Sequence, residues 1–303
     1  MNDDIKSKFR AFSVNKTLPD NTPYKSISID HVKIISQEFN ISCRELEIAS
    51  LESEIIPERY VRNMKSLSCE DQITLLKSKA TIVGLGGLGG SVCETLARIG
   101  VGTLNLIDGD VFEESNLNRQ VLSNESNICI PKADASKNRV TEINSSVTVI
   151  NHREFLNDKN ASAFIENSDI IIDCLDSLPG RFVLENASKK AGCKFISAAI
   201  AGYYGQITTI FPEDPGLKLI YGEAKNAPNK GAETSLGTLA HCVSLLASLE
   251  CSEAIKVLLN KGSLLRNKLL IIDLFDNSFE IISLLNSSKP NGTCLPVDRK
   301  HPV

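Results

Sequence analysis

The sequence predicts a doubly wound α/β fold built on a mainly parallel sheet. Short apolar runs alternate with helical periodicity between residues 80 and 199, which is the pattern of parallel strands joined by crossover helices. A glycine-rich turn, GLGGLG at residues 84–89, connects the first apolar run to the first helix. Such a turn brings backbone amides to the sheet edge where a doubly wound fold binds its ligand.

The individual elements follow from periodicity and from turn residues. The strands expected in the parallel region are residues 80–83, 103–107, 147–151, 169–174 and 194–199. The helices expected between them are residues 91–99, 133–143, 161–166 and 181–191. The C-terminal part is expected to contain a strand at 205–211, a loop-rich stretch at 212–231, a long helix at 235–259, and two antiparallel strands at 269–275 and 278–284.

The segment before this region has two parts. Residues 1–25 are polar and show no periodicity, so we expect a flexible or loosely docked arm. Residues 29–53 show a helical pattern, in which Ser42 and Glu45 form a capping box; this extension either packs on the main domain or offers a partner a docking surface. The chain is accordingly divided into the arm with the small helical extension (1–57), the main α/β domain (58–287) and an irregular tail (288–303).

Composition argues against several classes of protein. With 303 residues and a net charge of -4, the chain has no basic excess that favours nucleic acid or an anionic membrane surface. No apolar run reaches the roughly 18 residues of a transmembrane helix, and the first residues, MNDDIKSKFR, lack the apolar core of a signal peptide. We therefore expect a cytoplasmic protein. The nine cysteines are scattered without a C-x-x-C pair, which indicates reduced thiols and gives a zinc site little support.

The glycine-rich turn satisfies G-x-G-x-x-G through Gly84, Gly86 and Gly89. Because it lies between a predicted strand and a predicted helix, it is typical of a Rossmann-like nucleotide site. Asp108 ends the second predicted strand about twenty residues later, where a carboxylate can bind ribose hydroxyls. NAD, FAD and ATP all fit these two features.

The segment after Asp108 favours ATP. Polar donors crowd together at Asn116, Asn118, Arg119 and Gln120, and Lys132 follows soon after. A triphosphate needs such groups because its charge must be neutralised as phosphate oxygens are displaced, whereas hydride transfer does not.

Two carboxylates lie where the fourth predicted strand ends. They are Asp173 and Asp176, in the stretch IIDCLDSLPGRF. A carboxylate at this edge of the sheet can hold Mg²⁺ against the phosphates. A helix-capping role before Pro179 is the alternative.

Several of these segments together resemble the ThiF/MoeB/HesA family, bacterial relatives of the ubiquitin-activating enzymes. The resemblance rests on GLGGLG, LIDGDVFEESNLNRQ, the PK at residues 131–132, DCLDS and SEAIKVLL, and it runs from residue 59 to residue 284. It implies an ATP- and Mg²⁺-dependent adenylyltransferase that acts on a small ubiquitin-fold carrier protein ending in Gly-Gly. The C-terminal glycine carboxylate attacks the α-phosphate, and the products are an acyl-adenylate and pyrophosphate.

The resemblance also implies roles for individual residues. These are Gly84, Gly86, Gly87 and Gly89 for the nucleotide loop, Asp108 with its companion Asp110 for the ribose, Asn116, Arg119, Gln120 and Lys132 for the phosphates, and Asp176 as the magnesium-binding catalytic aspartate. In the family, an arginine of an R-Y-x-R motif enters the active site of the neighbouring protomer. RYVR occupies residues 59–62 here, so Arg62 is the candidate and a homodimer with two shared sites is implied.

Two departures from the family pattern bear on the chemistry. Many relatives carry two C-x-x-C pairs for structural zinc, which this chain lacks, so no zinc is expected. Relatives that form a thioester or an acyl-disulfide place a cysteine in the loop before the long helix, but none occurs here between Cys193 and Cys242. Cys242 is interpreted as a core residue. We expect adenylation only, with sulfur supplied by a separate donor; a reactive Cys242 or Cys251 is the alternative. Ser177 stands where relatives often have asparagine, which leaves one substrate contact open.

Other interpretations stay open. The substrate carboxylate that is activated could belong to a modified tRNA base or to a peptide, although the negative net charge of the chain argues against tRNA. A catalytically silent partner subunit would not require Arg119, Lys132 and Asp176 together. A nicotinamide-dependent enzyme survives only if the resemblance misleads.

Overall fold

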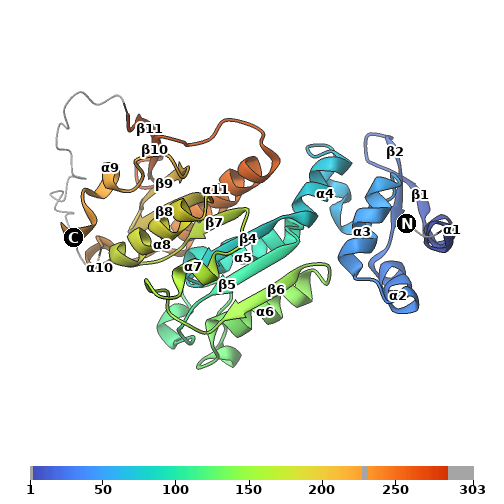
Figure 1. Ribbon diagram of the computed structural model, residues 1–303, viewed down its shortest axis with the longest axis horizontal. Coiled ribbons are helices and arrows are strands. Elements are labelled where there is room, and N and C mark those ends of the chain that lie inside the picture. The colour runs from blue at the N-terminus through green and yellow to red at the C-terminus, as the bar shows by residue number, and fades with distance from the viewer. Residues whose placement is uncertain (1–2, 227–230, 286–303) are drawn as a thin grey trace.

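The structure is a computed structural model that describes residues 3–226 and 231–285. Within these residues an eight-stranded sheet crosses the larger domain in the order β11-β10-β9-β8-β7-β4-β5-β6 (Figure 1). The strands are β4 (Lys79–Val83), β5 (Thr103–Ile107), β6 (Thr148–His152), β7 (Ile170–Asp173), β8 (Lys194–Ala201), β9 (Tyr204–Ile210), β10 (Lys268–Asp273) and β11 (Ser278–Ser283). Strands β4 to β8 are parallel, and β9, β10 and β11 are antiparallel. The predicted sheet is confirmed, with every predicted strand in place.

Helices cover both faces of the sheet, because the parallel strands are apolar on both sides. On one face, α5 (Gly87–Ile99), α6 (Lys132–Ile143) and α11 (Ala240–Leu259) pack on Ile82, Leu104 and Ile172. On the other, α7 (Ala161–Phe164) and α8 (Leu178–Lys190) pack on Val83, Ile171 and Phe195. The remaining short segments of this part are α9 (Lys218–Tyr221), η2 (Glu114–Asn116), η3 (Glu125–Asn127) and η4 (Ala224–Asn226).

The long helix begins later than the sequence pattern predicts. A separate turn of helix, α10 (Glu233–Leu236), precedes α11, which starts only at Ala240. The break occurs because Gly237 takes a positive φ of 72°, which an L-residue rarely adopts, and its amide caps α10 by bonding the carbonyl of Glu233.

The N-terminal arm is ordered rather than irregular, so this prediction is wrong. Its elements are α1 (Asp3–Phe12), β1 (Val14–Thr17) and β2 (Pro23–Ile27). They join α2 (Ile29–Phe39), α3 (Cys43–Glu52) and β3 (Ile56–Pro57) in a small domain with a three-stranded sheet. The core of this domain contains Ile5 and Phe9 of α1, which lie on one helix face because they are four residues apart. Phe12 packs against the same core, so the i, i+4, i+7 spacing of a helix is present in the sequence, and the sequence analysis missed it among the polar residues.

The small domain packs against the amino-terminal ends of the parallel strands. Arg44 of α3 donates to the carbonyl of Gly102, 2.7 Å away, and to the hydroxyl of Thr103 at the start of β5. Between the domains lie η1 (Glu58–Asn63) and α4 (Cys69–Lys77), a helix that the sequence analysis did not predict. Figure 1 shows this domain at the end of the molecule opposite α9 and α10. The packing role of the helical extension is thus visible, and its docking role stays a prediction. The tail at 288–303 lies outside the described residues.

Candidate functional site

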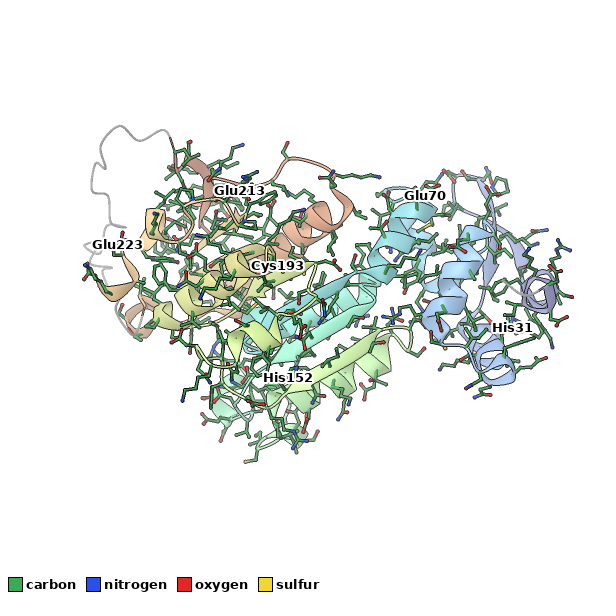
Figure 2. The ribbon with its side chains drawn as sticks, in the orientation of Figure 1. His31, Glu70, His152, Cys193, Glu213 and Glu223 are labelled. Atoms are coloured by element: carbon green, nitrogen blue, oxygen red, sulfur yellow. The ribbon has the colours of Figure 1, made fainter. Side chains whose placement is uncertain are left out.

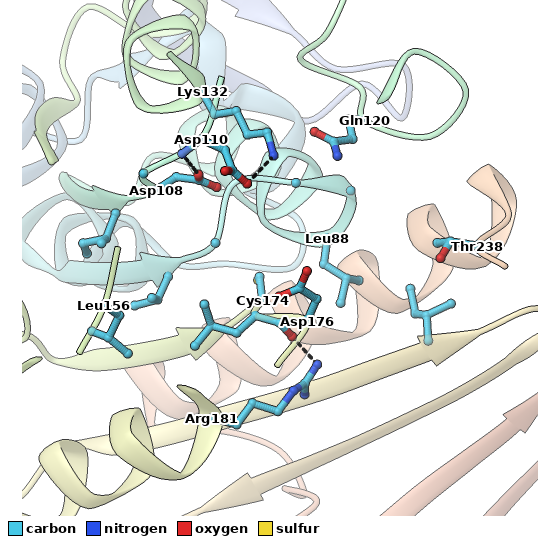
Figure 3. Close-up of a pocket in the computed structure, with 18 of the residues that line it drawn as sticks. Leu88, Asp108, Asp110, Gln120, Lys132, Leu156, Cys174, Asp176, Arg181 and Thr238 are labelled. Carbon is cyan, nitrogen blue, oxygen red and sulfur yellow. Dashed lines mark hydrogen bonds and ion pairs between the residues drawn. The ribbon is translucent and has the colours of Figure 1, made fainter. Parts of the chain in front are cut away.

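A cleft of about 280 Å³ opens at the carboxyl ends of the parallel strands. It lies where β4 has β5 on one side and β7 on the other, so the loops after β4 and β7 separate at this point. A doubly wound sheet binds its ligand at such a switch point. We call the side formed by residues 84–89, Asp108, Asp110 and Lys132 the glycine-loop wall, and the side formed by residues 173–177 and Arg181 the β7 wall (Figure 3).

The glycines of the loop are required by close backbone contacts. Gly84 has a φ of +87°, and a Cβ there would lie 2.6 Å from the carbonyl oxygen of Cys174. A Cβ at Gly89 would lie 1.8 Å from the carbonyl oxygen of Gly84. Gly86 is the N-cap of α5 and offers no side-chain cap, so the first amides of that helix are left for a ligand. Gly86 and Gly87 line the cleft, and an anion is the ligand that such a helix start favours.

Asp108 is held in place by the backbone. Its carboxylate accepts hydrogen bonds from the amide of Leu85 at 2.6 Å and from the amide of Asp110 at 2.7 Å. Burial raises the pKa of this carboxyl above its usual value, and the two backbone bonds oppose the shift. The side chain thus links the glycine loop to the end of β5, at the place where the sequence analysis expects the ribose.

Lys132 and Asp110 form an ion pair at the edge of the cleft. The ammonium lies 3.2 Å from the carboxylate. The lysine side chain is only 9% exposed and the aspartate side chain is 55% exposed. Any phosphate that Lys132 binds therefore competes with a carboxylate already beside it.

The polar residues that follow Asp108 in the sequence have two different positions: some line the cleft and one caps a turn. Arg119 and Gln120 line the cleft. The Gln120 side-chain oxygen is buried with no hydrogen-bond partner among the described residues, an unusual state that a ligand would relieve. Asn116 is buried and its side-chain oxygen accepts from the amide of Glu113. It caps the η2 turn and does not line the cleft, so a phosphate contact from Asn116 stays a prediction.

The two aspartates of the β7 wall have different environments. Asp173 is completely buried and is paired with Arg181 at 3.3 Å. Burial raises the pKa of the Asp173 carboxyl, and the Arg181 guanidinium opposes the shift. Asp176 is exposed and lines the cleft. Within the described residues its carboxylate has no hydrogen bond or ion pair, so it is the aspartate available to a metal ion.

The two arginines of RYVR point to different surroundings. Arg59 forms an ion pair with Glu47 at 3.3 Å and also bonds Asn144, so it belongs to the junction with the N-terminal domain. Arg62 is exposed and does not line the cleft of its own chain. Its turn packs at the amino ends of the strands, where Tyr60 lies against Gly100 just before β5. The cleft lies at the other end of β5, about 16 Å away along a strand of this length.

The cysteines that the sequence analysis considered reactive are buried. Cys242 and Cys251 are 1% and 2% exposed, and burial raises the pKa of both thiols. Cys174 lines the cleft, but burial raises its pKa as well. None of these environments favours a thiolate.

Neither a zinc-type cluster nor a membrane-spanning helix is found in residues 3–226 and 231–285. No group of three or more His, Cys, Asp and Glu side chains there could hold a metal ion. His31 lies in the N-terminal domain and His152 in the larger domain (Figure 2). None of the described helices is long and apolar enough to cross a membrane. Cys294 lies outside the described residues.

The residues present fit a nucleoside triphosphate with Mg²⁺. The glycine loop, the uncapped start of α5 and two cationic side chains suit phosphates. The unpartnered Gln120 oxygen is an acceptor, so it suits a hydroxyl or an N–H of the ligand. Of the described carboxylates that line the cleft, Asp176 and Glu154 have no hydrogen bond or ion pair. Asp176, at the end of β7, suits Mg²⁺, which commonly uses one or two protein carboxylates together with substrate phosphates.

The ThiF family model matches residues 60–295. This chain belongs to the ThiF family. The SAMP-activating enzyme E1 of Haloferax volcanii is 32% identical to it over 227 residues, which is 74% of this chain and 84% of that protein. Adenylyltransferase and sulfurtransferase MOCS3 of Xenopus laevis is 28% identical over 239 residues. That alignment covers 78% of this chain and 53% of the MOCS3 protein, so the ThiF-family chain spans about half the length of this relative.

Solved structures agree with the fold. A crystal structure of E. coli MccB with AMPCPP and MccA has a TM-score of 0.62 and 25% identity, and covers 75% of this chain and 71% of that one. Another MccB structure contains ATP. The fold predicted from the sequence and the family resemblance are therefore both confirmed.

Arg181 is a buried charged residue of the cleft that sequence reasoning missed, and Glu154, Glu233 and Thr238 also line the cleft without having been predicted. Arg181 was treated only as the start of a helix, yet it lies in the β7 wall with its guanidinium buried. The signal available in the sequence was an arginine in the first turn of a helix, where a cation is electrostatically unfavourable.

Proposed function

We propose that this chain uses ATP to adenylate the C-terminal glycine carboxylate of a small ubiquitin-fold sulfur-carrier protein, giving an acyl-adenylate and pyrophosphate. The observation that supports it most is the gathering of the glycine loop, Asp108, Lys132 and Asp176 around one cleft. The named activities of the SAMP-activating enzyme E1 and MOCS3 relatives agree with it.

The proposed reaction exchanges one phosphorus–oxygen bond for another. A carboxylate oxygen of the carrier attacks the α-phosphorus, the bond to the bridging β-oxygen breaks, and pyrophosphate leaves with the electron pair. Asp108 orients the ribose, and Arg119 and Lys132 neutralise the phosphate oxygens as charge shifts toward the leaving group. Asp176 would hold Mg²⁺, which adds to that neutralisation. No proton has to move, because the attacking carboxylate is already ionised at neutral pH.

A second copy of the chain completes the proposed site. Arg62 lies at the amino ends of the strands, and its own cleft lies at their carboxyl ends. If Arg62 acts on phosphate charge, it therefore acts on the cleft of a neighbouring protomer. A closed two-fold dimer supplies this contact twice.

The proposed chemistry stops at the adenylate. A thioester on this enzyme would need a thiolate near the activated carbonyl, and Cys174, the cysteine that lines the cleft, has a raised pKa because it is buried. We infer that sulfur comes from a separate donor. MOCS3 carries sulfurtransferase in its name, and the alignment leaves about half of that protein unmatched.

A peptide is the second candidate substrate. The observation that favours it is the likeness to MccB, which has been solved together with MccA. Adenylation would be the same at the site, and only the docking of the substrate would differ.

ATP–pyrophosphate exchange by the purified chain tests the proposal. Candidate ubiquitin-fold proteins ending in Gly-Gly are added one at a time, with and without Mg²⁺, and each is matched by a variant that lacks the last glycine. We expect exchange that requires both the intact carrier and Mg²⁺. Tight ATP binding without exchange on any carrier would contradict the carrier proposal and direct the search to peptides. Absence of ATP binding would contradict the adenylation proposal as a whole.

A further inference from the structure

The guanidinium of Arg181 connects the β7 wall to strand β8. It donates to Asp173 at 3.3 Å, to the hydroxyl of Ser197 at 3.2 Å and to the carbonyl of Ala198 at 2.6 Å. It also donates to the carbonyl of Leu175. These acceptors belong to the end of β7, to β8 and to the loop that leads into α8, and the arginine itself is only 5% exposed.

Asp173 completes this arrangement from the other side. Its carboxylate accepts from the hydroxyl of Ser197 at 2.7 Å and from the amide of Leu175 at 3.1 Å. The amide and the carbonyl of Leu175 are therefore both held, one by Asp173 and the other by Arg181. We call Asp173, Arg181 and Ser197 the Leu175 clamp.

The clamp fixes the peptide group that precedes Asp176. The carbonyl held by Arg181 belongs to the peptide bond between Leu175 and Asp176, so the plane of that bond is set. On the other side, the Ser177 hydroxyl accepts from the amide of Gly180 at 3.3 Å and caps α8. Asp176 thus lies between two anchored points, although its own carboxylate has no partner among the described residues. Figure 3 shows Arg181 and Asp176 on the side of the cleft opposite Lys132.

The choice of arginine is consistent with this role. A buried ion pair is weak evidence for stability, because desolvation of both charges offsets their attraction. Arginine, however, has five donors in a rigid fork and can hold several acceptors at once, which the point charge of lysine cannot do in the same geometry. The arrangement therefore suits the precise placement of a backbone segment.

We propose that Arg181 is a positioning residue, which acts through the Leu175 clamp to place the Asp176 carboxylate for Mg²⁺ bound with the nucleotide. The inference rests on the proposed function, because it takes Asp176 as the metal-binding carboxylate. Arg181 does not touch the metal or the phosphates in this role. It determines where the loop holds the side chain that does.

Calorimetric binding of AMPCPP with and without Mn²⁺ tests the role without turnover. The dissociation constant measured without Mn²⁺, divided by the one measured with Mn²⁺, gives the factor by which the metal strengthens binding. We call this factor the ratio. We expect Arg181→Lys to lower this ratio about tenfold or more, as is usual when a group that supports a metal ligand is lost. Metal-free AMPCPP binding should change less than about twofold, a bound set by a loss under roughly 0.4 kcal/mol.

The matched control is Arg266→Lys. Arg266 is also paired with a buried aspartate, Asp214, at 2.8 Å, and lies outside the cleft. We expect Arg266→Lys to leave the ratio unchanged.

If Arg181→Lys does not fold, Ser197→Ala takes its place, because Ser197→Ala removes one contact from each of Asp173 and Arg181 with little loss of volume. We expect Ser197→Ala to lower the ratio in the same direction. A ratio unchanged in these clamp variants, or a parallel loss of metal-free binding, would overturn the positioning role.

Asp176→Asn separates this inference from the proposed function. We expect it to remove the effect of Mn²⁺, and we expect Arg181→Lys to add no further loss in the double variant, since both changes act through one carboxylate. If Asp176→Asn alone kept the wild-type ratio, the metal role in the proposed function would fail and the clamp would fail with it. If Asp176→Asn lost the ratio and Arg181→Lys kept it, only the clamp would fail.

Discussion

The two walls of the cleft satisfy their polar groups in opposite ways. In the glycine-loop wall the charged side chains already have partners, because Asp108 binds backbone amides and Lys132 binds Asp110. In the β7 wall the charged group that faces the cleft, Asp176, has no partner in the described chain, and the polar bonds lie behind it around Leu175. In the glycine-loop wall a charged side chain must leave its present partner to bind a ligand. In the β7 wall the backbone that carries Asp176 is fixed before a ligand binds.

The largest effect is expected from Asp176→Asn. The change keeps the shape of the side chain and removes its charge, so Mg²⁺-dependent ATP–pyrophosphate exchange should fall at least about a hundredfold. Because Asp176 is exposed and unpaired, the melting temperature should stay close to that of the wild type. Wild-type exchange in this variant would contradict the catalytic role of Asp176. An equal loss of exchange and of thermal stability would show that the comparison of the walls is mistaken.

Removal of the lysine of the glycine-loop wall should greatly reduce exchange, and a mixed dimer should recover part of that activity. Lys132→Ala and Arg62→Ala should each reduce exchange at least about tenfold on their own. In an equal mixture with free subunit exchange, half the dimers are mixed and each has one intact site. Activity should therefore return to about one quarter of the wild-type value. The control is each variant mixed with itself, and a mixture no more active than its parents would count against the arginine from the second subunit.

Removal of Asp110, the partner of Lys132, should strengthen phosphate binding, and this change should be smaller than the losses of exchange above. Asp110→Ala frees the lysine, so competitive inhibition by inorganic phosphate should become about two- to fivefold stronger, the range expected for a half-exposed ion pair. Asp134→Ala is the matched control, because Asp134 is paired with Arg153 and does not line the cleft. Equal phosphate inhibition in both variants would mean that the Lys132–Asp110 pair does not restrain the lysine.

The last prediction concerns stability and pH and leaves the chemistry of the cleft aside. Glu250 of α11 is buried behind the β7 wall, with Asp173, Arg181 and the thiol of Cys174 as its charged and titratable neighbours. Burial, with the charge of Asp173, raises the pKa of Glu250 well above its usual 4.5. A raised pKa gives stability that is present below pH 4.5 and is lost as pH rises.

Glu250→Gln should therefore remove part of the loss of stability between pH 5 and pH 8. The slope of unfolding free energy with pH should become less negative by at most about 1.4 kcal/mol per pH unit. Melting temperatures of both proteins across this range measure it. Parallel curves for the two proteins would show that Glu250 is ionised in the folded state at all these pH values.

The sequence was a good guide to the sheet and a poor one to contacts between distant segments. Residues 170–172 are three isoleucines that are all buried, and this pattern can be read directly. The N-terminal helix α1 buries Ile5 and Phe9 and packs Phe12 beside them. This helical spacing is present in the sequence and was missed because the surrounding residues are polar. Motif spacing pointed to Asp108, Lys132 and the pair Asp173 and Asp176, and the family resemblance selected Asp176; the fold brings Asp108, Lys132 and Asp176 to one cleft. The resemblance could not supply the Leu175 clamp, because nothing local joins Asp173 to Ser197, twenty-four residues further along the chain.

The position of Arg62 has a consequence for the protein in solution. A subunit on its own can bind nucleotide in its cleft but, under the proposed function, lacks the arginine that completes the reaction. Dilution below the dissociation constant of the dimer should then switch off turnover while nucleotide occupancy persists. The amount of this protein that a cell makes would set the activity of each molecule as well as the number of molecules, so that output rises more steeply than abundance.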